Sequence, residues 1–228
     1  LLDLDPQGHV ARALQAQLKP GLGGLSQVLL DETGDKEVLD VIAQTDIPGL
    51  SVTPPDPGLR SAEDLLASRI GKEFVLRDAL RVTRTWYDTI LVDCPPNLGN
   101  LSINGLVAAD QVIIPCDPSP LALSGVEGLV STIEQVAGRL NPTIDVLGIL
   151  LTRVDGRNVK LNEAVYSELA ERWGDAALPV QIGVNSALAQ AQQEGRDIFD
   201  FAPDSRGARQ YRALADHLVG ALSEASVA

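Results

Sequence analysis

Short apolar runs rich in β-branched residues alternate with longer helical patterns along most of the chain, and this alternation constrains the fold most strongly. Ile90–Val92 and Val112–Ile114 are continuously apolar, which is typical of strands that helices cover on both faces. We therefore predict an α/β fold, a doubly wound and mostly parallel sheet with helices on both faces. The predicted strands are Leu1–Asp3, Leu50–Thr53, Thr89–Asp93, Gln111–Cys116, Ile144–Thr152 and Leu178–Ile182.

Apolar residues at helical spacing separate these strands. The stretch Gly21–Pro57 is rich in Gly, Pro and Asp, and we expect short helices and loops there. Because no convincing linker interrupts the chain, we predict a single domain over residues 1–228. The predicted helices are Val10–Leu18, Glu63–Ile70, Glu73–Arg84, Ala122–Leu140, Val159–Trp173, Ser186–Glu194 and Arg206–Leu222.

Composition narrows the classes of function. The formal net charge is −13, which argues against a uniformly basic nucleic-acid-binding surface but leaves room for a local basic patch. The two cysteines have no metal-site or redox-motif spacing and fit a reduced cytosolic compartment. No apolar run approaches the roughly 20 residues that span a bilayer. We therefore expect a cytoplasmic protein without a membrane partner.

The segment Leu1–Gly8, LLDLDPQG, places two carboxylates at the end of an apolar strand. Residues i and i+2 of a strand share a face, so Asp3 and Asp5 can point into the same crevice. In parallel sheets, ligands bind at the carboxyl ends of the strands. The chain also starts within this strand and contains no Met, so we expect that its natural beginning is missing.

A second polar strand end lies in Tyr87–Gly99, YDTILVDCPPNLG. Asp93 ends the apolar run, and one strand-end carboxylate can hold a nucleotide-bound Mg²⁺ through water. Pro95 and Pro96 fix the backbone and remove two donors, giving a stiff exit that could sense the end of a triphosphate. On spacing alone, the alternative that Asp93 only caps a loop stays open.

Five segments occur in a fixed order: DLDPQG, YDTILVDCPP, IPCDPSPLALSGVEGL, LGILLTRVDGR and GRDIFDFAPDSRGARQYRALADHL. Together they resemble the ParA family, which comprises MinD/ParA-type deviant Walker P-loop ATPases that partition plasmids and chromosomes. The resemblance covers nearly the whole chain. It implies a P-loop NTPase-like fold, with ATP and Mg²⁺ as cofactors.

The resemblance also implies roles for matching positions. Asp5 looks like the family's carboxylate that positions the attacking water, and Asp3 looks like its partner near the Mg²⁺ ligand sphere. Asp93 looks like the Walker B carboxylate on Mg²⁺. Pro95, Pro96 and Gly99 fall in a segment similar to the nucleotide-sensing switch. Phosphoryl transfer is mostly positioning and charge stabilisation, which suits a site with several carboxylates around one metal.

One departure from the family is severe. Members begin with a strand, a glycine-rich K-G-G-V-G-K-T loop and a helix, and these lie before the strand that opens this chain. No G-K-[ST] occurs elsewhere, since Gly71-Lys72 is followed by Glu73. That loop supplies the backbone cradle and the lysine for the phosphates, so we expect this chain as written to bind ATP poorly and hydrolyse it negligibly. Truncation is the preferred explanation, and a catalytically dead scaffold or interaction protein is the alternative.

The resemblance further implies an ATP-dependent homodimer, a ParB-like stimulating partner and non-specific DNA binding, with association with the nucleoid. The candidate DNA contacts lie in segments similar to the family's DNA-binding regions: Arg153, Arg157, Lys160, Arg196, Arg206, Arg209 and Arg212. Another basic stripe, formed by Arg77, Arg81 and Arg84 at helical spacing, is interpreted as a solvated face rather than a DNA surface. The C-terminal GALSEASVA is neither basic nor strongly amphipathic, which argues against membrane targeting by that route.

Overall fold

A computed structural model of the chain describes residues 1–14 and 23–225. These residues form two compact units. The first unit comprises Leu1–Asp110, Gly138–Thr143 and Gln192–Arg196, and the second comprises Gln111–Ala137, Ile144–Ala191 and Asp197–Ala228. The single domain over residues 1–228 stays a prediction.

The first unit contains two small pairs of strands. Strand β1 (Leu2–Asp3) runs parallel to β4 (Val92–Asp93), and β2 (Ala43–Gln44) runs antiparallel to β3 (Ser51–Val52). The helices of this unit are α1 (His9–Ala13), α2 (Leu25–Leu29), α3 (Leu59–Leu66), α4 (Val75–Ala79) and α5 (Asn100–Ala108), with 3₁₀ turns at Val38–Val41, Lys72–Phe74 and Thr83–Thr85. Leucines dominate the core, among them Leu4, Leu25, Leu29, Leu76 and Leu101, each at most 1 % exposed.

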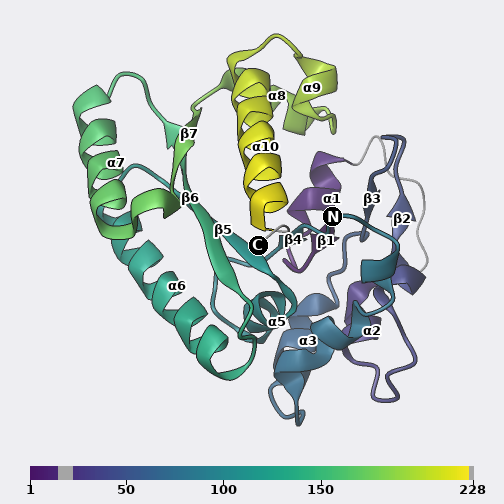
Figure 1. Ribbon diagram of the computed structural model, residues 1–228. Helices are drawn as coiled ribbons and strands as arrows, with labels where there is room; N and C mark the ends of the chain where they lie inside the picture. The colour runs from purple at the N-terminus through teal and green to yellow at the C-terminus, as the bar shows by residue number, and fades with distance from the viewer. Residues whose placement is uncertain (15–22, 226–228) are drawn as a thin grey trace. The chain divides into compact units, whose positions relative to one another are not determined.

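The second unit is a parallel three-stranded sheet in the order β5 (Gln111–Cys116), β6 (Asp145–Val154), β7 (Ala177–Gly183). Figure 1 shows α6 (Pro120–Arg139) and α7 (Val159–Trp173) on one face and α10 (Arg206–Ala225) on the other. The shorter helices α8 (Ser186–Gln193) and α9 (Ile198–Phe201) precede α10, and a 3₁₀ turn spans Gly174–Ala176. The predicted mostly parallel sheet with helices on both faces is confirmed.

Strand β4 and the residue before it are less buried than the sequence predicted. The continuous apolar run of Thr89–Asp93 predicted a strand covered on both faces, yet Leu91 is 56 % exposed and Val92 is only partly buried. Among the described residues, β4 has hydrogen-bonded neighbours only in β1. Burial on both faces needs neighbouring strands and covering helices, and the sequence of a strand does not supply them.

Helix boundaries agree with prediction for the long helices and disagree in the first unit. Helix α7 matches its predicted range, but the predicted helix Glu73–Arg84 is wrong: it is broken into α4 and two 3₁₀ turns. The side-chain oxygen of Asn104 accepts the Leu76 N–H (3.0 Å), so a tertiary partner replaces a helical one. Helix α3 begins earlier than predicted, and α5 was not predicted. The predicted helix Val10–Leu18 ends outside the described residues.

None of the helices in the described ranges is long and apolar enough to cross a membrane.

Candidate functional site

The pairing of β1 with β4 brings two of the predicted site carboxylates together. In this parallel register Leu2 lies opposite Val92 and Asp3 lies opposite Asp93. The Leu4 N–H then donates to the Asp93 carbonyl oxygen (2.9 Å), extending the ladder past both residues. Asp3 and Asp93 are therefore neighbours at the carboxyl ends of parallel strands; the sequence predicted a strand end for each, and the pairing of the two strands comes from the structure.

Asp3 is the buried member of the group, at 3 % exposed. Its Oδ1 accepts the Asp5 N–H (3.0 Å), and its Oδ2 accepts the Val10 N–H (3.2 Å) in the first turn of α1. Its own N–H donates to the Thr53 hydroxyl (2.8 Å), and Thr53 is 1 % exposed. Asp3 thus holds the turn between β1 and α1, and Thr53 is a supporting residue that sequence reasoning missed.

Asp5 lies beyond the strand, in a turn. Strand β1 ends at Asp3, so the expectation that strand alternation places Asp3 and Asp5 on one face is corrected. The Asp5 Oδ1 accepts the Gln7 N–H (2.9 Å), and the Asp5 carbonyl accepts the Gly8 N–H (3.0 Å). Gly8 has φ +63°, a left-handed conformation that favours glycine. Proline and glycine therefore form the turn that presents Asp5.

The three carboxylates interact electrostatically. Burial, and next the neighbouring charge of Asp93, raise the pKa of Asp3 above its ordinary value, against the hydrogen bonds from backbone N–H groups. Burial, and next the charge of Asp5, raise the pKa of Asp93, while His9 acts in the opposite direction. Mutual repulsion of this kind is relieved when a cation binds among the carboxylates.

Residues 94–99 connect β4 to α5 and contain the predicted nucleotide-sensing positions Pro95, Pro96 and Gly99. The Ser102 hydroxyl, on a residue 4 % exposed, donates to the carbonyl oxygens of Pro95 and Asn97. Gly99 is the N-cap residue of α5 and offers no side chain to cap it. Instead, Glu63 of α3 accepts the first amides of α5. No sequence signal we used indicated this contact, because 37 residues separate Glu63 from Asn100.

The residues present fit Mg²⁺ held with a nucleotide rather than an all-protein metal cage. In the described part of the chain, no group of three or more His, Cys, Asp or Glu side chains has the arrangement of a metal site. Mg²⁺ in nucleotide sites usually takes one or two carboxylates together with phosphates and waters. The Asp3 carboxylate accepts the Asp5 and Val10 amides, whereas Asp93 is exposed at its strand end and accepts no backbone amide from the described residues. Asp93 is therefore the better placed metal ligand of the pair.

Six of the seven predicted DNA contacts lie in the second unit, and two of them lie against carboxylates of the protein itself. Arg153 and Arg157 follow β6, where Arg157 forms an ion pair with Asp155 (2.6 Å) and Arg153 approaches Asp117 (3.4 Å). Lys160 is exposed in the first turn of α7. Arg153 is also the one described non-glycine residue with a positive φ, +55°.

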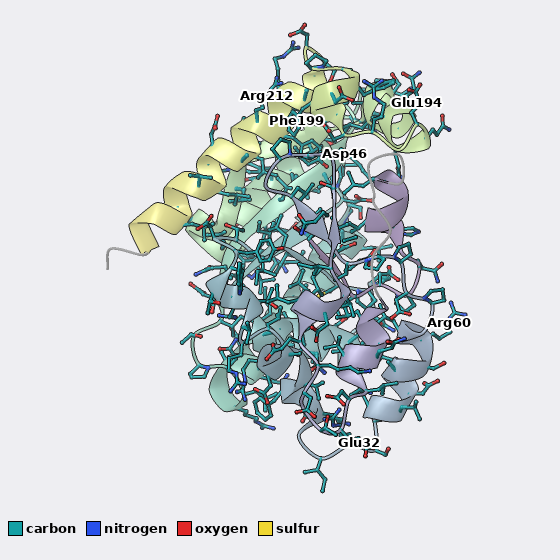
Figure 2. The ribbon with its side chains drawn as sticks, turned by 90° about the vertical axis from the view of Figure 1, so that its right-hand side faces the viewer. Glu32, Asp46, Arg60, Glu194, Phe199 and Arg212 are labelled. Atoms are coloured by element: carbon teal, nitrogen blue, oxygen red, sulfur yellow. The ribbon has the colours of Figure 1, made fainter. Side chains whose placement is uncertain are left out.

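The remaining members of this set lie on or near α10. Arg206, Arg209 and Arg212 are exposed on its first two turns. Arg212 lies over the Phe199 ring (5.1 Å to the ring centroid; Figure 2). Arg196 belongs to the first unit, where its Nη1 lies 3.8 Å from the Glu194 Oε2. The α10 arginines belong to the second unit, so Arg196 is not grouped with them.

The other basic stripe is not a helical face. Arg77 lies on α4 and Arg84 in the 3₁₀ turn that follows, with Arg81 between them, because the predicted single helix is broken. All three line a pocket of about 930 Å³ in the first unit. Carboxylates share this pocket: Arg84 pairs with Asp110 (3.3 Å). This mixture of charges agrees with the interpretation of a solvated surface.

The second unit is a parallel sheet with helices on both faces, and the first unit has carboxylates at the carboxyl ends of a parallel strand pair; both features are typical of α/β proteins of the nucleotide-binding type. A family model described as an AAA domain matches residues 1–146. The chain is 36 % identical over 225 residues to the chromosome-partitioning ATPase Soj of Thermus thermophilus, covering 99 % of this chain and 84 % of that protein. It is 34 % identical over 221 residues to the chromosome partitioning protein ParA of Caulobacter vibrioides, covering 96 % and 81 %.

Among solved structures, the fold is similar to that of a Mycobacterium smegmatis protein described as cobyrinic acid a,c-diamide synthase with bound ATP analogue and magnesium. The TM-score is 0.75 at 32 % identity, covering 96 % of this chain and 80 % of that one. The chain therefore belongs to the ParA family of P-loop partitioning ATPases.

Proposed function

We propose that this protein is a Mg²⁺-dependent ATPase that positions cargo, as ParA-type proteins position plasmids or chromosomes. The observation that carries the proposal is the register of β1 and β4, which sets Asp3 opposite Asp93 at the strand ends. The ATP analogue and magnesium in the M. smegmatis relative support the same cofactors here.

Each carboxylate has a separate role in this proposal. Asp93 would hold Mg²⁺, which would supply positive charge to neutralise the phosphates. Asp5, presented by the Pro6–Gly8 turn, orients the attacking water and accepts its proton. Asp3 keeps that turn in place through the Asp5 and Val10 amides. In the same proposal, the stiff backbone at Pro95, Pro96 and Gly99 responds to the last phosphate.

The test is hydrolysis of ATP by the full-length gene product. We expect Asp5→Ala to abolish turnover while Mg²⁺-ATP still binds, because Asp5 acts on water and does not hold the metal. Asp88→Ala is the matched control, since Asp88 is an exposed carboxylate just before β4. Unchanged turnover in Asp5→Ala excludes the role of Asp5. Failure of the wild-type protein to bind ATP favours the alternative, a scaffold that has lost the site.

The alternative, a scaffold that has lost the site, is tested by ATP binding to the chain itself. A polypeptide of these 228 residues contains no G-K-[ST] phosphate loop. We expect it to bind ATP poorly, because the backbone cradle and the phosphate lysine both belong to such a loop.

We also propose that the protein acts in the cytoplasm as an ATP-dependent homodimer that binds DNA non-specifically on the nucleoid. A ParB-like partner then stimulates hydrolysis and releases the DNA. The exposed arginines of α10, Arg206, Arg209 and Arg212, are the best placed contacts. Because phosphate contacts release counterions, affinity for random duplex should fall steeply as salt rises.

Replacing all three α10 arginines with Ala should weaken DNA binding and reduce the slope of log K against log salt by about one for each lost phosphate contact. Arg139→Ala is the control, since Arg139 is exposed at the end of α6. Binding that is insensitive to salt, or a triple variant with unchanged affinity, excludes this surface.

A further inference from the structure

The beginning of α5 is capped by a residue from another helix. The first two amides of α5 donate to the Glu63 carboxylate of α3, Asn100 N–H to Oε1 (2.6 Å) and Leu101 N–H to Oε2 (2.9 Å). The Asn100 side chain donates in return to the Glu63 carbonyl oxygen (3.0 Å). Both carboxylate oxygens are thus engaged by otherwise unpaired amides of a helix start, where negative charge is favourable.

A Cβ atom at position 99 would compete with this contact. Gly99 has φ −82° and ψ −170°, an extended conformation that any residue adopts. A Cβ atom there would overlap the Glu63 Oε1 and lie 3.0 Å from its Cδ. The local backbone therefore accepts other residues, but a Cβ at position 99 would displace the Glu63 carboxylate from its place at the start of α5.

Helix α3, which carries Glu63, is held in place by hydrogen bonds and by burial. The Asp56 carboxylate, just before α3, accepts the Ser26 N–H of α2 (2.6 Å) and the Gly58 N–H (2.9 Å). Helix α3 is buried through Leu59, Ala62 and Leu66. Residues 94–99 are consequently tied at their carboxyl end to a packed pair of helices, in addition to the bonds from the Ser102 hydroxyl of α5 to Pro95 and Asn97.

We propose that Glu63 is a positioning residue for nucleotide binding, acting by holding residues 94–99 in the conformation that presents Asp93, Pro95 and Pro96. This inference rests on the proposed ATPase function and assigns it a residue outside the predicted site. The Glu63 carboxylate hydrogen-bonds the start of α5, and in this proposal its effect reaches the nucleotide through the backbone of the segment. Hydrogen bonds to a charged acceptor are the stronger kind, so removing the charge should loosen the segment.

The test compares Glu63→Gln with Asp64→Asn in the full-length protein. Each variant removes one negative charge from α3, but Asp64 is exposed. The glutamine keeps the shape of Glu63 and replaces one acceptor oxygen with an NH₂ group, which cannot accept a backbone amide. We expect Glu63→Gln to weaken binding of a fluorescent ATP analogue about three- to tenfold, the range of a lost helix cap, and Asp64→Asn to leave it unchanged.

Two further measurements separate positioning from a loss of stability. Binding is measured at a temperature where circular dichroism shows both variants fully folded. Amide hydrogen exchange at Asn100 and Leu101 should accelerate in Glu63→Gln only. Equal nucleotide affinity in Glu63→Gln and wild type, with both folded, overturns the proposal.

A double-mutant cycle with Gly99→Ala adds an independent check. Since the alanine Cβ would meet the Glu63 carboxylate, Gly99→Ala should weaken nucleotide binding less in a Glu63→Ala background than in wild type. If the effects of the two substitutions on the free energy of nucleotide binding are additive, the assigned contact is overturned. Loss of nucleotide binding by the wild-type protein would refute the proposed function instead, so the two failures are distinguishable.

Discussion

Replacing Thr53 with Val tests how the strand end that carries the candidate site is held. The Thr53 hydroxyl accepts the Asp3 N–H at 2.8 Å, and both residues are buried, at 1 % and 3 % exposed. Valine has nearly the same shape but no acceptor, so the Asp3 N–H would be buried without a partner. Leaving such a donor unsatisfied costs about 1–3 kcal/mol of unfolding free energy.

The assay is thermal or urea unfolding followed by circular dichroism. For a chain of this size each kcal/mol corresponds to about 2–4 °C, so the melting temperature should fall by roughly 2–12 °C. Thr53→Ser is the control, because it keeps the hydroxyl and loses one methyl group, worth about 1 kcal/mol. Hydrogen exchange at the Asp3 amide should accelerate in Thr53→Val alone.

A Thr53→Val protein as stable as wild type, with Thr53→Ser destabilised, would refute the reasoning. That result would mean that methyl packing, and not the hydroxyl, holds the end of β1.

Two other predictions concern the second unit. Gly148→Ala in β6 would place a Cβ in overlap with the buried side chain of Leu178, so we expect a loss of about 1–3 kcal/mol in urea unfolding. Gly128→Ala, in the middle of α6, meets nothing within 4 Å and should stabilise by about 0.5–1 kcal/mol; similar effects at both positions would contradict the packing argument. The side-chain hydrogen bond from Arg157 lowers the pKa of Asp155 to about 2, from an ordinary 3.8. The charged carboxylate thus contributes stability above about pH 4, which is lost as the pH falls toward 2. Arg157→Ala should raise that pKa in an NMR titration, and an unchanged value would exclude the ion pair.

Sequence reasoning succeeded where a local pattern carries the physical cause. The 15-residue helix α7 was predicted at its observed bounds, and β5 likewise, because an amphipathic period and an apolar run are properties of neighbouring residues. The strand-end positions of Asp3 and Asp93 also followed from the sequence, whereas the pairing of β1 with β4 that makes them neighbours came from the structure.

Predictions failed where distant residues decide the outcome. Glu73–Arg84 has helical periodicity, yet the Asn104 side chain takes an amide of that segment and the helix breaks. The buried helix α5 was missed because it is apolar on most sides, so no amphipathic period marks it. Asp5 lies in a turn rather than on the strand, because the Asp3 carboxylate binds its N–H.

By itself, the sequence determined the α/β class, the family and the carboxylates at two strand ends, because alternation, spacing and motif order are local and linear. Only the tertiary structure decided how those carboxylates are supported. Thr53 and Glu63 act across 50 and 37 residues of chain, respectively. Contacts of that kind depend on which strands and helices become neighbours when the core packs, and a linear pattern does not encode that proximity.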